Sequence, residues 1–236
     1  MLERVVTALP SNVRQRLRRL RRPAWFGSLG GVTPISESWG FDRGTPVDRY
    51  YIEQFLTERR GDIRGRVLEI LDSSYTRRFG TDVARADVLD INAANPKATI
   101  VADLTAATDV PGDQFDCFVL TQTLHLIYDT RAAVAHAHRL LRPGGVVLAT
   151  LPVVSRIVPR YGLEADQWRF TAASARRMFA DEFGDAQVEV RTYGNVLASV
   201  AFLKGVAVEE LSRRRLEVHD PFFPMLVAVR AVKRGG

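Results

Sequence analysis

A carboxylate near the end of an apolar run is the first feature of this chain that could do chemistry. Residues 67–75 read Val-Leu-Glu-Ile-Leu-Asp-Ser-Ser-Tyr, so Glu69 lies in a strand-like stretch that breaks into a short polar loop. In nucleotide-binding α/β folds, this junction between first strand and first helix contacts the ligand. A carboxylate there can accept hydrogen bonds from a ribose or a cationic group. The segment therefore predicts a cofactor site in which the side chains of Asp72 and Ser73 also take part.

The length and composition predict one large globular domain. A chain of 236 residues with 46% apolar and 25% charged residues can bury a sizeable core. Its only cysteine, Cys117, lies in an apolar run, so we expect a buried thiol and no intramolecular disulfide. No apolar run reaches the ~18 residues of a membrane span. Because the N-terminus lacks the apolar core of a secretory signal, we expect a cytoplasmic protein.

The positive charge is concentrated near the N-terminus. Six arginines fall between Arg14 and Arg22, after Ser11, which can cap a helix with an apolar stripe. A solvated basic helix is the favoured interpretation, and an anionic surface contact or a mitochondrial targeting peptide are the alternatives. We do not expect nucleic acid as a partner, because no aromatic residue is interleaved for base stacking. We expect residues 1–38 to form this helix and a connection, and residues 39–236 to form the main domain.

Strand and helix patterns alternate along the main domain. Strands are expected over residues 66–71, 83–90, 99–102, 115–120, 146–151, 188–190 and 225–232. Helices are expected over residues 48–60, 75–79, 130–141, 172–183 and 196–211. This alternation predicts an α/β fold with a doubly wound, mostly parallel seven-stranded sheet. The last strand lies close enough to residues 187–192 to pair with them in the antiparallel direction.

Four segments in this order resemble the class I S-adenosylmethionine-dependent methyltransferase superfamily. They are residues 67–70, 100–104, 115–124 and 139–148, the last reading Arg-Leu-Leu-Arg-Pro-Gly-Gly-Val-Val-Leu. Residues 44–60 and 168–171 are similar to a bacterial subgroup associated with glycan or natural-product gene neighbourhoods, sometimes fused to a glycosyltransferase. The resemblance, over about residues 35–235, implies a Rossmann-like methyltransferase fold and S-adenosylmethionine as cofactor. It also implies a small-molecule substrate and a glycosyltransferase or other biosynthetic partner, with a homodimer left open.

The resemblance assigns cofactor contacts to acids at strand ends. Glu69 corresponds to the carboxylate that neighbours the methionine amino group. Asp90 matches the acid that accepts hydrogen bonds from both ribose hydroxyls, although Asp87 competes for this role. Asp103 and Leu104 match the pair that contacts the adenine, the carboxylate accepting from the exocyclic amine.

Thr121 and Gln122 end the fourth strand, where cofactor and substrate meet in the superfamily. Because parallel strands present their carboxyl ends at one edge, all these positions should line one crevice. Structural interpretations stay open for several of them: Glu69 and Asp103 could cap following turns, Asp90 could be a loop acid, and Thr121 could pack at a strand end.

The first loop departs from the superfamily pattern. An acid-x-Gly-x-Gly-x-Gly run is usual, whereas this chain has Leu71, Ser73 and Tyr75 at the glycine positions. Glycine permits a positive φ and lets the backbone approach a ligand closely. Either the loop takes another path and holds the cofactor through Asp72, Ser73 and Ser74, or the site has become too narrow and the cofactor role is lost.

Methyl transfer requires a held nucleophile and in some cases a base. His125 lies four residues after Thr121, where a neutral imidazole could accept a proton from a hydroxyl near pH 7. Asp166 lies in the segment after the fifth strand that covers the substrate in the superfamily. Both are candidate catalytic residues, alongside Asp129, Glu164 and His219. No group of His, Cys and Asp residues has metal-ligand spacing.

Aromatic and cationic residues near the expected crevice could bind a substrate. Trp168 could stack on a sugar ring or an aromatic acceptor, and packing against the core is its alternative. Arg43, Arg49 and Tyr50 suit a carboxylate or phosphate, unless their charges pair within a solvated lid.

Together these features predict methyl transfer from S-adenosylmethionine to a hydroxyl of a saccharide or secondary metabolite. Two alternatives follow from the altered loop. The protein has lost methyl transfer and acts as a binding partner, or the fold catalyses another natural-product reaction such as a cyclisation.

Overall fold

The computed structural model describes Pro10, Val13 and residues 27–158 and 161–235. The chain divides into two compact units, Met1–Pro34 and Ile35–Gly236. In the first unit the described element is the 3₁₀ helix η1 (Gly27–Gly30). The basic helix predicted around Arg14–Arg22 lies outside the described residues.

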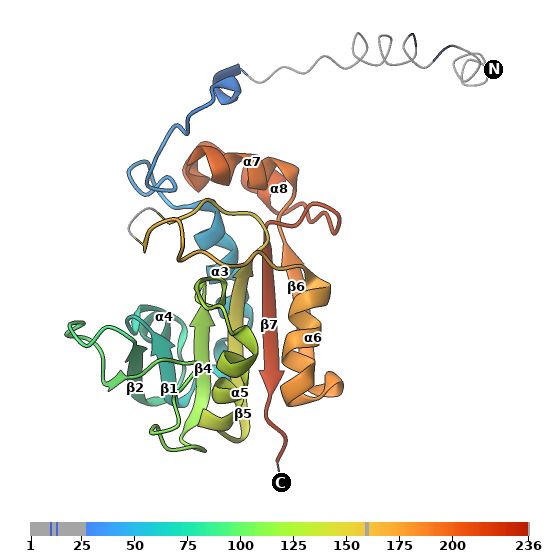
Figure 1. Ribbon diagram of the computed structural model, residues 1–236. Coiled ribbons are helices and arrows are strands. Elements are labelled where there is room, and N and C mark those ends of the chain that lie inside the picture. The colour runs from blue at the N-terminus through green and yellow to red at the C-terminus, as the bar shows by residue number, and fades with distance from the viewer. Residues whose placement is uncertain (1–9, 11–12, 14–26, 159–160, 236) are drawn as a thin grey trace. The chain divides into compact units, whose positions relative to one another are not determined.

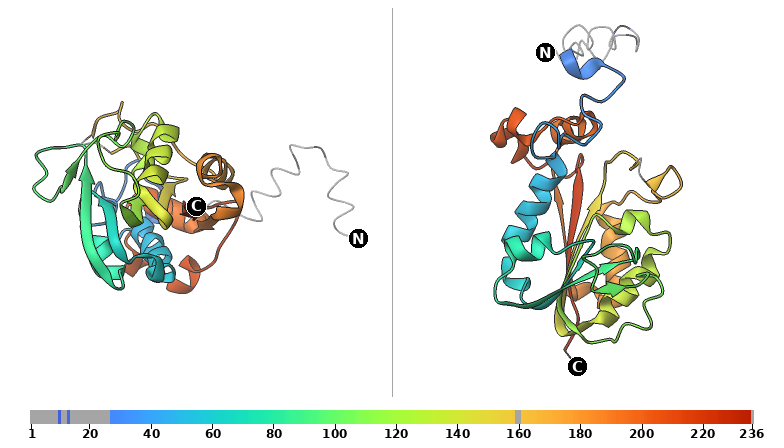
Figure 2. Two further views of the ribbon diagram at one scale, coloured as in Figure 1. Left: turned by 90° about the horizontal axis from the view of Figure 1, so that it is seen from below. Right: turned by 90° about the vertical axis from the view of Figure 1, so that its left-hand side faces the viewer.

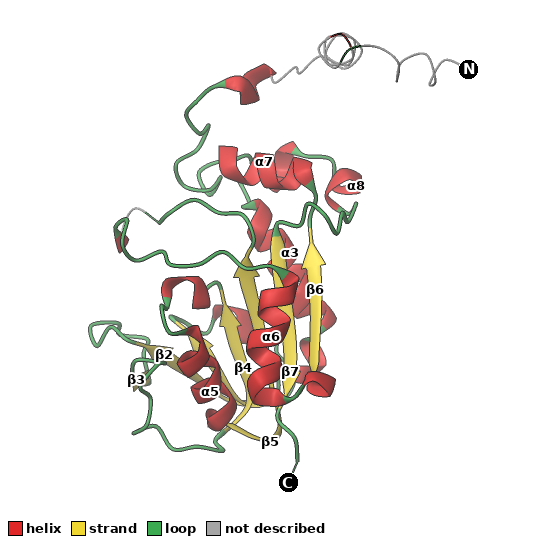
Figure 3. Ribbon diagram, turned by 45° about the vertical axis from the view of Figure 1, so that its right-hand side comes forward, coloured by secondary structure: helices red, strands yellow, loops and turns green. Residues whose placement is uncertain are grey.

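The second unit contains a seven-stranded sheet (Figures 1 and 3). Its strands are β1 (Gly65–Ile70), β2 (Val83–Asp90), β3 (Ile100–Val101), β4 (Phe115–Thr121), β5 (Leu141–Pro152), β6 (Val188–Tyr193) and β7 (Leu226–Val232). The order across the sheet is β3-β2-β1-β4-β5-β7-β6. Strands β1 to β5 pair in parallel, whereas β7 runs antiparallel to both β5 and β6. The predicted doubly wound, mostly parallel sheet with an antiparallel last strand is confirmed.

The strand order reverses between β1 and β4. From β1 the chain proceeds outward through β2 to β3, and then returns to place β4 on the other side of β1. At such a switch point, the loops leaving the two neighbouring strands diverge and open a crevice at their carboxyl ends. This topology locates the expected ligand crevice beside the ends of β1, β2 and β4.

Helices cover both faces of the sheet (Figure 2, right). They are α3 (Val47–Glu58), α4 (Ser74–Phe79), α5 (Thr130–Leu140), α6 (Ala172–Phe183), α7 (Val196–Lys204) and α8 (Arg213–Leu216). Short 3₁₀ helices are η2 (Arg60–Asp62), η3 (Leu124–Leu126), η5 (Asp185–Gln187) and η6 (Val208–Glu210). Helices α5 and α6 cover one face and α3 covers the other, whereas α7 packs against α3 beyond the edge at which the parallel strands end (Figure 1).

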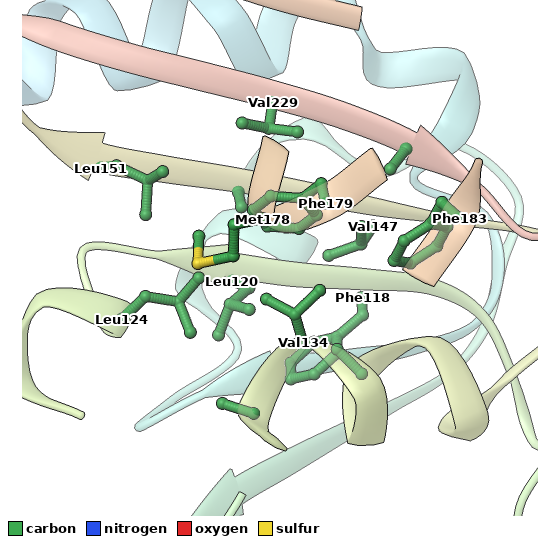
Figure 4. Close-up of a cluster of buried hydrophobic side chains, with 14 of the residues drawn as sticks. Phe118, Leu120, Leu124, Val134, Val147, Leu151, Met178, Phe179, Phe183 and Val229 are labelled. Carbon is green, nitrogen blue, oxygen red and sulfur yellow. The ribbon is translucent and has the colours of Figure 1, made fainter. Parts of the chain in front are cut away.

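Each face of the sheet has its own apolar core because strand side chains alternate. In β4, Phe118 and Leu120 pack against α5 and α6 (Figure 4), whereas Cys117 and Val119 pack on the α3 side. All four are fully buried. The continuous apolar sequence of β4 thus reflects burial on both faces.

Two predicted boundaries were wrong. The helix predicted over 196–211 ends at Lys204, because Gly205 adopts a left-handed conformation with φ of +70° and caps it. Strand β5 begins at Leu141 rather than at 146, since the Pro-Gly-Gly stretch continues along β4 with an irregular register.

Among the described residues, no helix combines the length and the apolar character needed to cross a membrane.

Candidate cofactor site

The loop after β1 turns sharply at Leu71. Leu71 has a φ of +70°, and the Asp72 N–H donates to the Ile70 carbonyl oxygen at 2.8 Å, which is the hydrogen bond of a γ-turn. The Leu71 N–H donates to the Leu89 carbonyl at 3.1 Å, and Asn95 Nδ2 donates to the Leu71 carbonyl at 2.8 Å. Leu71 therefore adopts a left-handed backbone conformation that favours glycine. Its hydrogen bonds with neighbouring residues enforce this conformation.

The two bulky residues of this loop lie in different surroundings. Leu71 is 49% exposed, so its side chain lies partly in solvent. Tyr75 is in the first turn of α4, where it packs against the core on the α3 side. The backbone turn is thus formed without burying Leu71.

Glu69 is buried and caps α4. Its Oε1 accepts from the Tyr75 N–H at 3.0 Å and its Oε2 from the Thr76 N–H at 2.7 Å. Burial raises the pKa of Glu69, while these two hydrogen bonds favour the ionised form. Both oxygens are engaged, so the capping interpretation describes the contacts that this structure contains.

Asp72 and Ser73 make contacts within the loop and its surroundings. Asp72 Oδ1 accepts from the Ser74 N–H at 2.9 Å, and its Oδ2 pairs with Lys97 at 3.2 Å. The buried Ser73 Oγ accepts from Arg77 Nε at 3.0 Å and Nη2 at 2.8 Å. These hydrogen bonds brace the loop, and they engage the side chains predicted to contact a ligand.

Asp90 is the last residue of β2, at the carboxyl end of the strand. Its Oδ1 accepts from the Asn92 N–H at 2.9 Å and its Oδ2 from Asn95 Nδ2 at 2.7 Å. Asp87 is fully buried within the strand and pairs with Arg66 at 2.7 Å. Of the two competing acids, Asp90 has the position expected of a ribose ligand.

Asn95 was not predicted from the sequence, although it joins two of the candidate segments. Its side chain bonds both Leu71 and Asp90 and so fixes the loop after β1 against the loop after β2. The Asn95-Pro96 dipeptide is a turn signal that could have drawn attention to it. The contact itself depends on how the loop after β2 folds back.

Asp103 and Leu104 follow β3. Asp103 is exposed, and its Oδ1 accepts from both the N–H and the Oγ1 hydroxyl of Thr105 at 2.8 Å. Leu104 is buried in the core shared with α5 and α6. Asp103 is therefore accessible to a ligand, whereas Leu104 belongs mainly to the core.

Thr121 and Gln122 lie where β4 ends. Gln122 has a φ of +46°, and its N–H donates to the Thr150 carbonyl at 2.9 Å. Within the described part of the chain, its buried Nε2 has no hydrogen-bond partner. A buried donor without a partner is costly, so this amide is a candidate ligand contact.

His125 lies in η3 and is 6% exposed. Its Nδ1 has no partner among the described residues, and its carbonyl oxygen accepts from the Gln167 and Trp168 N–H groups at 2.8 and 3.1 Å. Burial lowers the pKa of His125 to about 4, so the imidazole is neutral at pH 7. The Asp166 carboxylate is buried and pairs with Arg169 at 3.0 Å, which leaves His125 as the less engaged of the two candidate bases.

Side-chain hydrogen bonds join residues 36–46 to η6. Arg43 Nε donates to Glu210 Oε2 at 2.9 Å, and a second hydrogen bond makes the pair bidentate. The N–H and Oγ1 of Thr45 donate to Glu209 at 2.8 and 2.7 Å. For Arg43, the interpretation as a paired lid charge describes the observed contacts.

Arg49 and Tyr50 lie in the first turn of helix α3. The Arg49 guanidinium lies 5.2 Å from the ring centroid of Phe41 and 5.6 Å from that of Tyr75. The ring of Tyr50 packs edge-on against Tyr51 at 5.2 Å. Arg49 has no ion pair within 4.0 Å among the described residues, and its guanidinium lies against these two aromatic faces.

Trp168 and Tyr128 form an exposed aromatic pair. Their ring centroids are 5.8 Å apart, and Trp168 Nε1 donates to the Ile127 and Tyr128 carbonyl oxygens at 3.1 Å. The segment after β5 is thereby joined to the loop after β4. Tyr128 was missed in the sequence, where an isolated tyrosine gives no signal of its partner.

Two clefts in the described part of the chain lie apart from these residues. One of about 230 Å³ adjoins β6 and includes His219, whose Nε2 is 2.8 Å from Thr192 Oγ1. The other, of about 330 Å³, includes His138 and Lys233. Neither is lined by Glu69 or the other strand-end acids, and the described residues contain no group of three or more potential metal ligands.

Comparisons with known proteins concern the family and the fold of the chain. Residues 61–149 match the family model described as a methyltransferase domain. Similar solved structures include an S-adenosylmethionine-dependent methyltransferase from Mesorhizobium loti, with 14% identity, coverage of 79% of this chain and 100% of that chain, and a TM-score of 0.52. Another from Archaeoglobus fulgidus has 13% identity, 78% and 94% coverage, and a TM-score of 0.51. The [4+2]-cyclase SpnF has 14% identity, 82% and 85% coverage, and a TM-score of 0.50.

No curated protein sequence matches the chain. At these identities the structural likenesses establish the fold, and the family match covers the segment from η2 into β5. The chain therefore contains a segment that matches a methyltransferase domain, within a fold that it shares with S-adenosylmethionine-dependent methyltransferases.

Proposed function

We propose that this protein transfers a methyl group from S-adenosylmethionine to a hydroxyl of a saccharide or secondary metabolite. The turn at Leu71 is the observation that carries the proposal. Although leucine replaces glycine, the backbone keeps a positive φ, and the side chain stands partly in solvent. The loop therefore retains the conformation that brings backbone groups close to a ligand.

The residues at the strand ends fit an adenosyl cofactor. Each oxygen of a carboxylate can accept more than one hydrogen bond, so Asp90 can bind ribose hydroxyls while it holds Asn95. Asp103 is exposed and can accept from an exocyclic amine, and the buried Gln122 amide offers a free donor. When bound, S-adenosylmethionine supplies an electrophilic methyl group for in-line displacement.

The acceptor would lie beside Trp168 and Tyr128. An exposed aromatic pair can stack on the apolar face of a sugar ring or on an aromatic acceptor. His125 is neutral at pH 7 and its Nδ1 is unengaged, so it is the proposed acceptor of the hydroxyl proton. Asp166 would act indirectly, by holding Arg169 and the segment that carries Trp168.

Calorimetric titration with S-adenosylhomocysteine and S-adenosylmethionine tests the cofactor role. We expect saturable binding by the wild-type protein and at least ~10-fold weaker binding by Asp90→Ala, because charge-assisted hydrogen bonds would be lost. Asp181→Ala, an exposed acid on α6, is the matched control and should bind normally. Leu71→Gly should bind as well as the wild type or better.

The absence of binding at millimolar ligand in both the folded wild type and Leu71→Gly would contradict the cofactor role. Acceptor chemistry is tested separately, by supplying S-adenosylmethionine with a labelled methyl group and a panel of hydroxylated saccharides and phenols. Mass spectrometry then reports which acceptor gains the label.

A second candidate is a methyltransferase-like protein without methyl transfer. The Glu69 carboxylate favours this candidate, because both of its oxygens already accept hydrogen bonds from backbone N–H groups of α4. Such a protein would serve a biosynthetic complex, or would catalyse another reaction such as a cyclisation, the activity named for SpnF. Cofactor binding without label transfer to any acceptor would favour this candidate.

A further inference from the structure

An apolar surface lies where α7 meets the turn before β7. We call it the α7 surface, and it consists of the exposed side chains of Val196, Leu203, Val218, Phe222 and Phe223. Phe222 is 87% exposed and Phe223 is 55% exposed. Leaving several large apolar side chains together in water is unfavourable, and such patches mark interaction sites.

The turn that carries the two phenylalanines is fixed. Pro221 precedes the pair and Pro224 follows it. The Phe223 N–H donates to the Asp220 carbonyl at 3.2 Å, and the Phe222 N–H donates to Asp220 Oδ1 at 2.9 Å. The Asp220 N–H donates to the Gly194 carbonyl at 3.0 Å, which joins the turn to the start of α7. The exposure of the rings is therefore built into the fold.

Helix α7 contributes an apolar stripe to the same surface. Its inner face buries Ala198, Ala201 and Phe202. Val196 and Leu203 are seven residues apart, so they lie on one face of the helix, and that face is exposed. Apolar residues on all sides are typical of a helix with partners on both faces, and the described residues cover only one of them.

Three consecutive arginines adjoin this apolar surface. Arg213, Arg214 and Arg215 form α8 and are all exposed. Within the described part of the chain, none of them has an ion-pair partner within 4.0 Å. Asn195, just before α7, joins the arginines to the apolar surface. Its Nδ2 donates to the Arg215 carbonyl at 2.8 Å and to the Val218 carbonyl at 2.6 Å.

We propose that the α7 surface and the α8 arginines dock this protein on an anionic phospholipid membrane. Protruding aromatic side chains beside exposed cations match the interface between acyl chains and negatively charged headgroups. Phe222 is 87% exposed, so its side chain projects into solvent as a side chain that inserts between lipid headgroups would. Helices α7 and α8 lie beyond the edge of the sheet at which the parallel strands end, so this edge would face the membrane (Figures 1 and 3).

A fluorescent probe on the α7 surface provides a local test. Val218→Cys can be labelled with an environment-sensitive dye in the full chain, because the native Cys117 is completely buried. We expect a blue shift and quenching by spin-labelled lipid on vesicles that contain phosphatidylglycerol, and a much weaker response on phosphatidylcholine alone. The same dye at Val101→Cys, an exposed position on the edge strand β3, is the control and should not respond.

Two sets of variants separate the apolar and the ionic parts. Phe222→Ser/Phe223→Ser in the labelled protein should weaken partitioning at least ~10-fold. Replacing Arg213, Arg214 and Arg215 by Gln should weaken partitioning about 100-fold at low salt. The matched control replaces Arg64, Arg131 and Arg177 by Gln, which removes the same charge elsewhere and should have a small effect.

Each contrary outcome overturns the proposal. They are a probe at position 218 that does not respond to anionic vesicles, unchanged partitioning of the phenylalanine variant, and equal losses in the two arginine sets. A probe response that depends on protein concentration without vesicles would instead identify the α7 surface as a contact between copies of this chain.

Discussion

Leu71 has a positive φ in the loop after β1, which is the proposed cofactor loop. A left-handed conformation costs a residue other than glycine about 1–2 kcal/mol. Three hydrogen bonds, from Asp72, to Leu89 and from Asn95, hold the turn and offset this cost. Strain that is enforced in this way is typical of functional loops, so the turn supports the proposed cofactor role.

At the residue scale, His125 should make stability depend on pH. Its pKa is about 4 in the folded protein and about 6.5 when unfolded, because burial disfavours the charged imidazole. The unfolded chain therefore binds more protons between these values, so stability falls as the pH decreases from 6.5 to 4. His125→Gln should remove this contribution, up to ~3 kcal/mol, as measured by urea unfolding across that range.

The comparison must use the difference between wild type and variant. Burial raises the pKa of Asp48 to about 6, so Asp48 opposes His125 over part of the same range. Asp48 is unchanged in His125→Gln, and its effect cancels in the difference. If the two proteins have the same pH slope, the imidazole is not buried in its neutral form.

At the scale of elements, α7 depends on one buried cap. Asn195 Oδ1 accepts from the Ala198 N–H at 3.1 Å, and its Nδ2 bonds the carbonyl oxygens of Arg215 and Val218. One side chain thus starts α7 and also fixes α8 and the segment that follows it. The conformation of the α7 surface therefore depends on the hydrogen bonds of Asn195.

Substitution of Asn195 should separate these two roles. Asn195→Ala removes the cap and leaves two carbonyl groups without their donors, so it should lower the free energy of unfolding by about 2–4 kcal/mol. Asn195→Ser keeps an acceptor for the helix N–H and should cost distinctly less. Equal losses in the two variants, measured by chemical denaturation, would show that the cap contributes nothing.

At the scale of the whole molecule, the sheet has its centre in β4. This strand lies between β1 and β5, and both of its faces are covered by helices. Cys117 is in its middle, is fully buried, and has a raised pKa because burial disfavours the thiolate. No local opening at the edge of the sheet can expose this side chain.

Thiol labelling at Cys117 should consequently report global unfolding. We expect no reaction with a thiol reagent under native conditions and full reaction in denaturing urea, since attack requires an exposed thiolate. The labelling midpoint should coincide with the unfolding midpoint from circular dichroism. Labelling well below that midpoint would reveal an opening of the central strand that the packing argues against.

The local sequence was sufficient for most of the fold. Apolar runs such as 115–120 and amphipathic stretches such as 130–141 predicted strands and helices in the right order, because side-chain periodicity is a local property. The acid at the end of β2 was also located by its position after a strand. The C-terminal end of α7 was predicted wrongly. The apolar pattern continues past Gly205, so the local sequence did not identify this glycine as the cap of the helix.

The sequence by itself determined the alternating elements, the doubly wound sheet and the edge at which the candidate residues gather. The tertiary structure alone decided what those residues contact. Asn95 reaches back to Leu71, Arg43 pairs with Glu210, and a fixed turn holds Phe222 in solvent. Such contacts join residues brought together only when the sheet forms, so no local pattern in the sequence contains them.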